Sequence, residues 1–305
     1  MKTLAEIMGR VSVPLVTPFR EDETVDHEAL ERLIDFVITR NFCDSLIVTG
    51  TTGEFYSLSD DERIEIWKTA LAACGRRVPL IAGTGAASTR AAVCFTELAE
   101  RMGFDVAMCV LPYYSRPTQE GIYQHFKAVA AATRLPVLLY NIPLFTGVNM
   151  EPETLQRLVE IPNIRGIKEE AGIQPTQATA FALRTPPEFS LYCGDDTMVL
   201  QVLPQRGVGV VSGGSQAVGN WMKAMIAAYY AGDNARASQI YLRLAPFFES
   251  LNQNGRVNPI SILRAAIELV SGIRIGPPRR PQMPATEQER SVTGAILRRL
   301  AEETP

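Results

Sequence analysis

A repeated pair of segments constrains the fold of this chain more than any other feature: a short apolar run, then an amphipathic stretch with helical spacing. The apolar runs are continuous and rich in β-branched residues, which is typical of parallel strands covered on both faces. They occupy residues 11–16, 45–49, 78–82, 106–111, 137–140, 164–168, 189–193 and 208–212. Eight such units in roughly 230 residues predict a (β/α)₈ barrel, an α/β fold. A doubly wound sheet is the alternative, but Gly207-Val208-Gly209, the nearest approach to a dinucleotide fingerprint, lies inside the eighth run and not after the first.

Helix boundaries are marked by residues that cap backbone amides. Asp26 precedes a helix that begins near Glu28, and Ser59 with Glu62 fits a capping box. Beyond the eighth run, residues 221–231, 235–251, 259–270 and 286–300 have helical patterns. We expect the first of these to complete a barrel domain over residues 1–232. The others predict a C-terminal helical extension over residues 233–305, whose apolar faces pack on the barrel or on another subunit.

Composition excludes several classes of partner. The 305 residues are 46% hydrophobic with a net charge of −3 and no basic block, which argues against a nucleic-acid partner. No apolar stretch approaches the ~20 residues of a membrane-spanning helix, and residues 1–10 lack the features of a signal peptide. Five widely spaced cysteines, mostly in apolar runs, indicate buried, reduced thiols in a cytoplasmic protein. With two histidines and no metal-binding motif, we expect no metal, and the partner is a small molecule or another protein chain.

Polar residues gather where the predicted strands end, and these ends form the active-site mouth of a barrel. Lys168 ends the sixth strand. Alternation puts it on the same face as Gly166, whose small size leaves room for a lysine aimed into the barrel. Desolvation there disfavours the ammonium form and favours a nucleophilic amine, suited to Schiff-base chemistry with a ketone. The alternative is a solvated lysine paired with Glu169 or Glu170.

The other strand ends carry hydroxyl groups. Tyr140 ends the fifth strand, either as a buried structural tyrosine or as a phenol that transfers protons to a substrate on Lys168. Thr51 and Thr52 lie in a glycine-flanked turn, as plain turn residues or as a cradle for a carboxylate. Tyr114 follows the fourth strand as a core, interface or site aromatic. The segment 213–215 either forms an amide nest for a phosphate or gives space near the substrate.

Taken together, these motifs resemble the dihydrodipicolinate synthase / N-acetylneuraminate lyase family. The segments that carry the resemblance are Gly50-Thr51-Thr52-Gly53-Glu54, Tyr113-Tyr114, Tyr140-Asn141-Ile142-Pro143, Gly166-Ile167-Lys168-Glu169 and Gly194-Asp195-Asp196. The resemblance runs from about Gly9 to the C-terminal helices. It implies a pyruvate-dependent class I aldolase or lyase on a (β/α)₈ barrel, which needs no cofactor and assembles as a homodimer or homotetramer.

The resemblance also implies a role for each motif. Lys168 forms the Schiff base with pyruvate or another 2-oxo acid, and Tyr140 transfers protons. Thr51 relays protons with Tyr140 and Tyr114, the last supplied by a neighbouring subunit. Further residues are expected to line the substrate, namely Gly50, Thr52, Phe145, Val210 and Ser212.

Two departures from the family pattern bear on the substrate. Leu144 and Phe145 follow Pro143, where the synthases have an arginine that binds the carboxylate of aspartate semialdehyde. Ala87 and Ala91 stand where the family's lysine-feedback site has polar residues. Both favour an aldolase acting on a 2-keto-3-deoxy (4-hydroxy-2-oxo) acid. The alternatives are a dihydrodipicolinate synthase with Arg116 or Arg184 in place of the missing arginine, a 2-oxo acid dehydratase, and a catalytically silent binding barrel.

Overall fold

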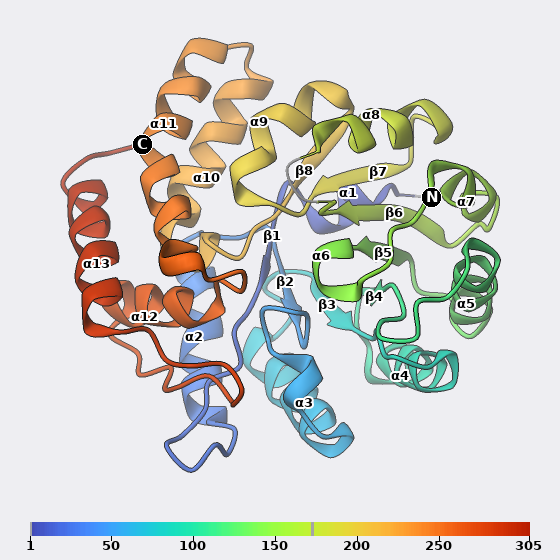
Figure 1. Ribbon diagram of the computed structural model, residues 1–305, viewed down its shortest axis with the longest axis horizontal. Coiled ribbons are helices and arrows are strands. Elements are labelled where there is room, and N and C mark those ends of the chain that lie inside the picture. The colour runs from blue at the N-terminus through green and yellow to red at the C-terminus, as the bar shows by residue number, and fades with distance from the viewer. Residues whose placement is uncertain (1, 172–173) are drawn as a thin grey trace.

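The computed structural model describes residues 2–171 and 174–305. Its centre is a closed barrel of eight parallel strands, each paired with its neighbours in chain order (Figure 1). The strands are β1 (Val11–Pro14), β2 (Ser45–Val48), β3 (Leu80–Gly83), β4 (Val106–Val110), β5 (Val137–Asn141), β6 (Ile164–Glu169), β7 (Ser190–Cys193) and β8 (Gly207–Val211). Every strand coincides with a predicted apolar run, with bounds that differ by at most two residues. The predicted barrel is confirmed.

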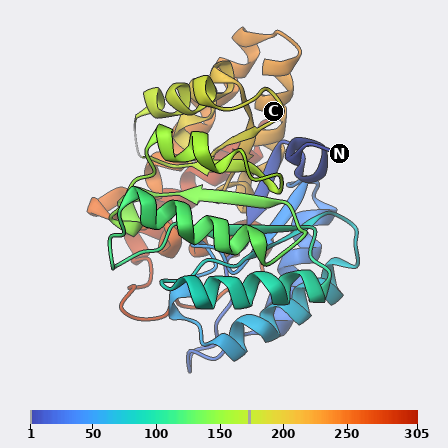
Figure 2. The ribbon, with the colours of Figure 1, turned by 90° about the vertical axis from the view of Figure 1, so that its right-hand side faces the viewer.

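Helices surround the barrel, as Figure 2 shows for the side formed by α4 to α8. They are α1 (Leu4–Met8), α2 (His27–Thr39), α3 (Asp60–Cys74), α4 (Thr89–Met102), α5 (Gln119–Ala131), α6 (Pro143–Thr146), α7 (Pro152–Leu158), α8 (Pro175–Arg184), α9 (Val199–Val202), α10 (Ser215–Tyr230), α11 (Asn234–Ser250), α12 (Ile260–Ser271) and α13 (Glu287–Ala301). Asp26 caps α2, and Ser59 forms the predicted capping box with Glu62 at the start of α3. The connection from β7 to β8 differs from the amphipathic helical stretch expected after each strand: it holds the four-residue α9 between 3₁₀ turns, the second of which contains Pro204.

The amino ends of the strands are closed by the first helix. Leu4 and Met8 of α1 belong to the apolar cluster that fills the barrel interior, together with Ile47, Ile81 and Leu138. The backbone N–H of Ala5 donates to Ser190 Oγ at 3.2 Å, and the Tyr192 hydroxyl donates to the carbonyl of Gly9 at 2.7 Å. A ligand therefore approaches the barrel interior from the carboxyl ends of the strands.

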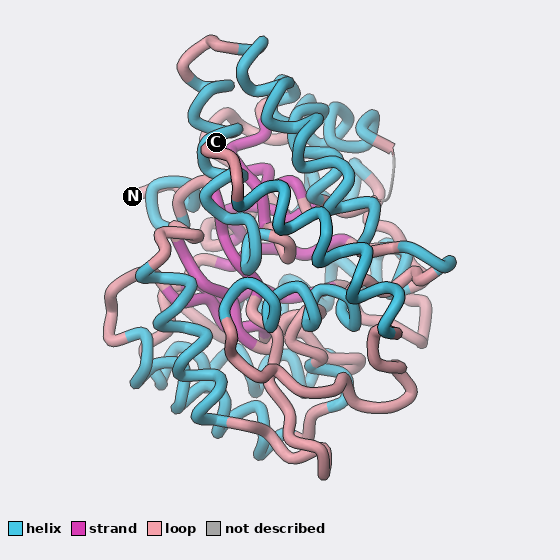
Figure 3. Tube along the Cα trace, turned by 90° about the vertical axis from the view of Figure 1, so that its left-hand side faces the viewer, coloured by secondary structure: helices cyan, strands magenta, loops and turns pink. Residues whose placement is uncertain are grey.

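The C-terminal helices pack on the barrel of their own chain. Helix α10 contacts both α11 and α12, and α13 lies against α11 and α12 (Figure 3). Arg264 of α12 is buried, and its Nη1 donates to the Thr17 carbonyl and to Glu54 Oε1, each at 2.8 Å. The extension is thus bound to the loops that follow β1 and β2.

Two sequence predictions concern membrane-spanning helices and the state of the cysteines. Over the described residues, the helices are all too short or too polar to cross a membrane. The five cysteines are free thiols; Cys43, Cys74, Cys109 and Cys193 are buried, whereas Cys94 is exposed. The expectation of buried thiols thus holds for four of the five.

Candidate active site

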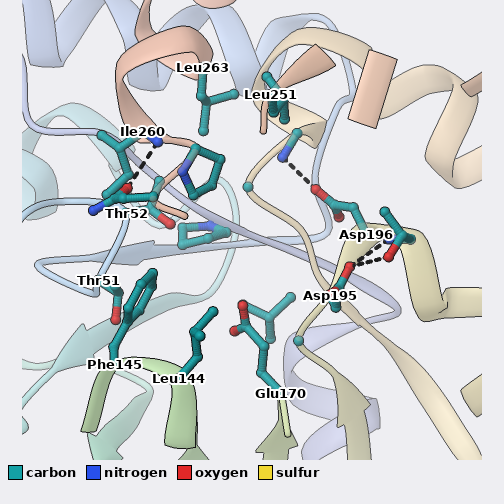
Figure 4. A pocket seen from close by; sticks show the side chains of 18 of the residues that line it. Thr51, Thr52, Leu144, Phe145, Glu170, Asp195, Asp196, Leu251, Ile260 and Leu263 are labelled. Atoms are coloured by element: carbon teal, nitrogen blue, oxygen red, sulfur yellow. Dashed lines mark hydrogen bonds between the residues drawn. The ribbon is translucent and has the colours of Figure 1, made fainter. Parts of the chain in front are cut away.

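A cavity of about 170 Å³ lies at the carboxyl ends of the strands (Figure 4). Five of the predicted site residues line it: Thr51, Thr52, Tyr140, Phe145 and Lys168. The facing wall comes from the C-terminal extension, whose lining residues are Phe248, Leu251, Asn252, Val257, Asn258, Pro259, Ile260 and Leu263. The structure therefore gathers side chains from both halves of the chain around one cavity.

Lys168 is buried, with 7% of its side chain exposed. Its Nζ lies 3.0 Å from Glu170 Oε2 and 3.9 Å from the centre of the Tyr140 ring. Gly194 gives the lysine its space, because a Cβ there would lie 2.9 Å from Lys168 Cε. The expectation that Gly166 makes this room is wrong: a Cβ at Gly166 would meet Leu4 Cδ1 at 2.8 Å and the Ser190 carbonyl at 2.5 Å. Gly166 accommodates α1 and β7, not the lysine.

Tyr140 is buried beside the lysine, and its hydroxyl donates to Glu170 Oε2 at 2.8 Å. Burial raises the pKa of Tyr140 well above its ordinary value, the charge of Glu170 raises it further, and a hydrogen bond with the Thr51 side chain opposes the rise. The phenol is consequently protonated at neutral pH. It can donate a proton to a bound group and receive one through its two hydrogen-bonded neighbours.

Glu170 was not among the predicted site residues. It lines the cavity, and its Oε2 faces both Lys168 Nζ and the Tyr140 hydroxyl. Burial raises the pKa of the Glu170 carboxyl, and attraction to Lys168 opposes that rise. Strand alternation could have identified Glu170 as a site residue, because residues two apart share a face and Glu170 stands two residues after Lys168. The sequence interpretation treated Glu170 only as a partner of a solvated lysine.

The turn after β2 contributes Thr51 and Thr52 to the cavity wall. Gly53 N–H donates to the Gly50 carbonyl and Glu54 N–H to the Thr51 carbonyl, each at 3.0 Å. Within the described ranges, the N–H groups of Thr51 and Thr52 have no acceptor. These two donors and the threonine hydroxyls suit a carboxylate. Gly50 closes the turn behind Thr51 and is not one of the residues that line the cavity.

Two of the predicted substrate-binding residues at the end of β8, Val210 and Ser212, do not line the cavity. Val211 and Gly213 line the cavity, whereas Val210 packs in the core between barrel and helices. Ser212 is buried beside them, where its Oγ accepts hydrogen bonds from the Ser215 N–H at 3.0 Å and the Ser215 hydroxyl at 2.6 Å. The cause is a register shift between β7 and β8, which reverses the faces of the residues that follow.

Tyr114 lies away from the cavity of its own chain. The residue is 95% exposed, and its backbone has a φ of 70°, in the left-handed region. The preceding Tyr113 packs edge-on against Phe55, with ring centres 5.9 Å apart. A single chain therefore leaves the third predicted member of the proton relay outside the site.

Carboxylates dominate the charge in the cavity. Asp195, Asp196 and Glu170 line it, and Lys168 is the only cationic lining side chain in residues 2–171 and 174–305. Burial raises the pKa of Asp196 to about 7. Asp196 Oδ2 accepts the N–H of Gly214 at 2.8 Å. The segment 213–215 was considered above as an amide nest for a phosphate. The Asp196 carboxylate already accepts the Gly214 N–H that such a nest would use.

The two arginines considered as replacements for the missing arginine lie elsewhere. Arg184 pairs with Glu153 at 2.8 Å on the surface. Arg116 lies against Gly147, where an added Cβ would come within 3.3 Å of its Nε. Neither arginine lines the cavity.

A second, largely apolar cavity adjoins the first beside Phe145. The two cavities share Thr51, Phe145, Val257 and Asn258. Aromatic and aliphatic side chains make up most of the wall of the second cavity. Its other lining residues are Phe55, Tyr56, Val110, Tyr113, Ile142, Thr146 and Gln282. The space next to Phe145 is thus suited to uncharged groups.

Comparison with known proteins agrees with this geometry. Residues 7–300 match the model of the dihydrodipicolinate synthetase family. The chain is 40% identical to the 4-hydroxy-tetrahydrodipicolinate synthase of Moorella thermoacetica, over 95% of this chain and 97% of that one. It is 42% identical to the enzyme of that name from Bacillus subtilis, over 92% and 96% of the two chains. The crystal structure of a dihydrodipicolinate synthase from Bacillus anthracis superimposes with a TM-score of 0.90 at 36% identity, covering 95% of this chain and 98% of that one. The resemblance read from the strand-end motifs is confirmed, and the chain belongs to the dihydrodipicolinate synthetase family.

Proposed function

We propose that this chain is a pyruvate-dependent Schiff-base aldolase that cleaves or forms a 4-hydroxy-2-oxo acid whose aldehyde half is uncharged and unphosphorylated. The reactive group is the Lys168 amine, which attacks the 2-oxo carbon. Thr51 and Thr52 bind the adjacent carboxylate through their free N–H groups and hydroxyls. Tyr140, hydrogen-bonded to Thr51 and Glu170, moves protons at the reacting carbons.

The chemistry follows from the electron demand of the imine. A protonated imine on Lys168 draws electrons from the C3–C4 bond of a 4-hydroxy-2-oxo acid. Loss of the hydroxyl proton then releases the aldehyde and leaves an enamine, which takes a proton at C3 and is hydrolysed to pyruvate. In the reverse direction, the enamine of pyruvate attacks the aldehyde.

One observation carries the choice of an uncharged aldehyde: three carboxylates and no second cation line the cavity, within the part of the chain that is described. A charge-assisted hydrogen bond from an arginine contributes ~1.5–3 kcal/mol to binding a carboxylate. Leu144 and Phe145 offer no such donor, and the acidic side chains that line the cavity supply no positive charge to attract an anion. A phosphate is disfavoured for the same reason.

A second candidate function is supported by the comparisons. Relatives at 40–42% identity over more than nine-tenths of this chain carry the name 4-hydroxy-tetrahydrodipicolinate synthase. On this alternative, pyruvate condenses with aspartate semialdehyde. A third candidate function is that of a 2-oxo acid dehydratase, because the same imine can expel a hydroxyl group instead of breaking a carbon–carbon bond.

We further propose that the active form is a homodimer or homotetramer in which Tyr114 completes the site of a neighbouring copy. Its almost full exposure in the single chain supports this assignment. The cytoplasmic location expected from the cysteine usage stays a prediction.

The test is a substrate screen with a covalent control. Pyruvate with borohydride is expected to leave one reduced pyruvyl group on Lys168, and Lys168→Ala is expected to lose both the adduct and turnover. Pyruvate release is then measured from 2-keto-3-deoxy acids, beside condensation of aspartate semialdehyde with pyruvate. A kcat/KM for aspartate semialdehyde above that for every keto-deoxy acid would establish the synthase instead. Absence of an adduct in the wild type would contradict Schiff-base catalysis altogether.

A further inference from the structure

Glu170 is the one carboxylate in direct contact with the reactive amine, among the residues that the structure describes. Its Oε2 lies 3.0 Å from Lys168 Nζ and accepts the Tyr140 hydroxyl at 2.8 Å. Tyr140 of β5 pairs in register with Lys168 of β6, and Glu170 directly follows the last residue of β6. A single oxygen atom therefore touches both groups that carry the proposed chemistry.

We propose that Glu170 is a catalytic acid–base residue that takes a proton from the Lys168 ammonium and returns it to the hydroxyl group that leaves when the imine forms. The inference rests on the proposed Schiff-base function of Lys168. It goes beyond that function because it assigns the proton transfers of imine formation to a residue that the motif resemblance did not include.

The protons balance as follows. The Lys168 ammonium gives one proton to the Glu170 carboxylate, and the resulting neutral amine adds to the 2-oxo carbon. The nitrogen of this adduct passes a second proton to the new alkoxide through the Tyr140 hydroxyl, giving a neutral carbinolamine. The carbon–oxygen bond breaks as Glu170 returns its proton to the hydroxyl group. Water leaves, and a protonated imine stands beside the Glu170 carboxylate.

Glu170 is better placed for this role than the other nearby carboxylates. Glu169 turns to the opposite face, where Asn141 Nδ2 donates to it at 3.0 Å and the Ala171 N–H at 2.8 Å. Asp195 accepts the N–H and hydroxyl of Thr197, and Asp196 accepts the N–H of Gly214. The charged and titratable groups that act on Glu170 are Lys168 of β6, Tyr140 of β5, the adjacent Glu169, and Cys193, Asp195 and Asp196 at the end of β7 and in the loop after it.

The test measures the rate of imine formation. Enzyme and pyruvate are mixed rapidly, quenched with borohydride at set times, and the Lys168 adduct is quantified by mass spectrometry. General acid–base assistance contributes ~10²–10⁴ to a rate, so Glu170→Gln is expected to slow adduct formation by that factor at pH 7. The variant also lacks an internal base, so its rate is expected to rise in proportion to hydroxide concentration, whereas the wild-type rate is nearly level over the same range.

Two further variants separate this role from a structural one. Glu170→Ala with added formate, a small carboxylate that fits the vacated space, is expected to regain part of the lost rate. Glu169→Gln removes a carboxylate one residue away and is expected to keep the wild-type pH profile. An equal rate and profile in the wild type and Glu170→Gln, or an equal loss in Glu169→Gln, would overturn the assignment. A wild type without any adduct would instead overturn the proposed function.

Discussion

The glycine at position 194, directly after β7, determines how closely this part of the backbone approaches the reactive lysine. A Cβ at this position would lie 2.9 Å from Lys168 Cε and 2.8 Å from Glu170 Cβ, below ordinary contact distance. Both neighbours belong to the proposed machinery, so a single methyl group there displaces the amine from its partner.

Gly194→Ala is therefore expected to lose most pyruvate trapping and turnover while the barrel still folds. A small shift of a reacting group, of ~1 Å, can reduce a rate ~10²-fold. Gly294→Ala is the matched control, since a Cβ at this position in α13 meets its nearest neighbour at an ordinary 3.4 Å. Single-turnover kinetics and thermal unfolding of both variants provide the measurement. Wild-type trapping in Gly194→Ala would show that the lysine tolerates the displacement.

Tyr140→Phe tests the phenol without disturbing the packing. The ring stays in place and only the hydroxyl is lost, so kcat is expected to fall by ~10²–10⁴ with little change in stability. Tyr192→Phe is the control: its hydroxyl donates to the Gly9 carbonyl at the opposite end of the barrel. That change is expected to cost ~0.5–1.5 kcal/mol of stability and to leave kcat intact. Similar turnover in both variants would assign Tyr140 a structural role only.

At the scale of elements, the buried ion pair between Arg264 and Glu54 connects α12 to the turn that carries Thr51 and Thr52. Its side chains are 2% and 0% exposed, and Arg264 also donates to the carbonyls of Thr17 and Ile275 at 2.8 Å. Removing one partner of such a pair leaves an uncompensated buried charge. The position of the carboxylate cradle thus depends on a helix more than 200 residues away.

Arg264→Met is expected to reduce the free energy of unfolding by ~3–5 kcal/mol and to weaken pyruvate binding. Adding Glu54→Gln is expected to recover part of the stability, because the unpaired carboxylate is then absent. The exposed pair Arg274–Glu21 serves as the comparison, and Arg274→Met is expected to change stability by ~1 kcal/mol or less. Denaturant unfolding measures all three. An Arg264→Met variant as stable as Arg274→Met would contradict the proposed importance of the pair.

Regular elements were predictable from the sequence, and the site only in part. Apolar runs locate all eight strands because parallel strands bury both faces, and capping residues mark the starts of α2 and α3. Val210 and Ser212 were expected to line the substrate, but with the register shift beside β7 it is Val211 and Gly213 that line the cavity. The space around Lys168 comes from Gly194, which directly follows β7, and no pattern within the sixth apolar run indicates it. The extension's contribution to the cavity depends on tertiary packing, which local periodicity does not encode.

For the whole molecule, the exposure of Tyr114 predicts that activity depends on assembly. If its hydroxyl completes a neighbour's relay, the active species is at least a dimer, and specific activity is expected to fall on dilution. Sedimentation in parallel with activity measurements tests this. Tyr114→Phe keeps the ring and is expected to lower kcat without changing the sedimentation profile. A monomer that is fully active at assay concentration would exclude a shared site.

The origin of the cavity walls has a consequence for how this chain can diversify. The groups proposed for the chemistry stand on β5, β6 and the turn after β2, whereas residues 248–263 supply the opposite wall from the segment that follows the completed barrel. Substitutions in that segment can alter the fit of the aldehyde half while the lysine and its partners keep their positions. Because the reacting groups and the facing wall come from separate parts of the chain, the range of substrates can change while the reaction stays the same. The connection between α11 and α12 is therefore the natural segment to exchange between relatives.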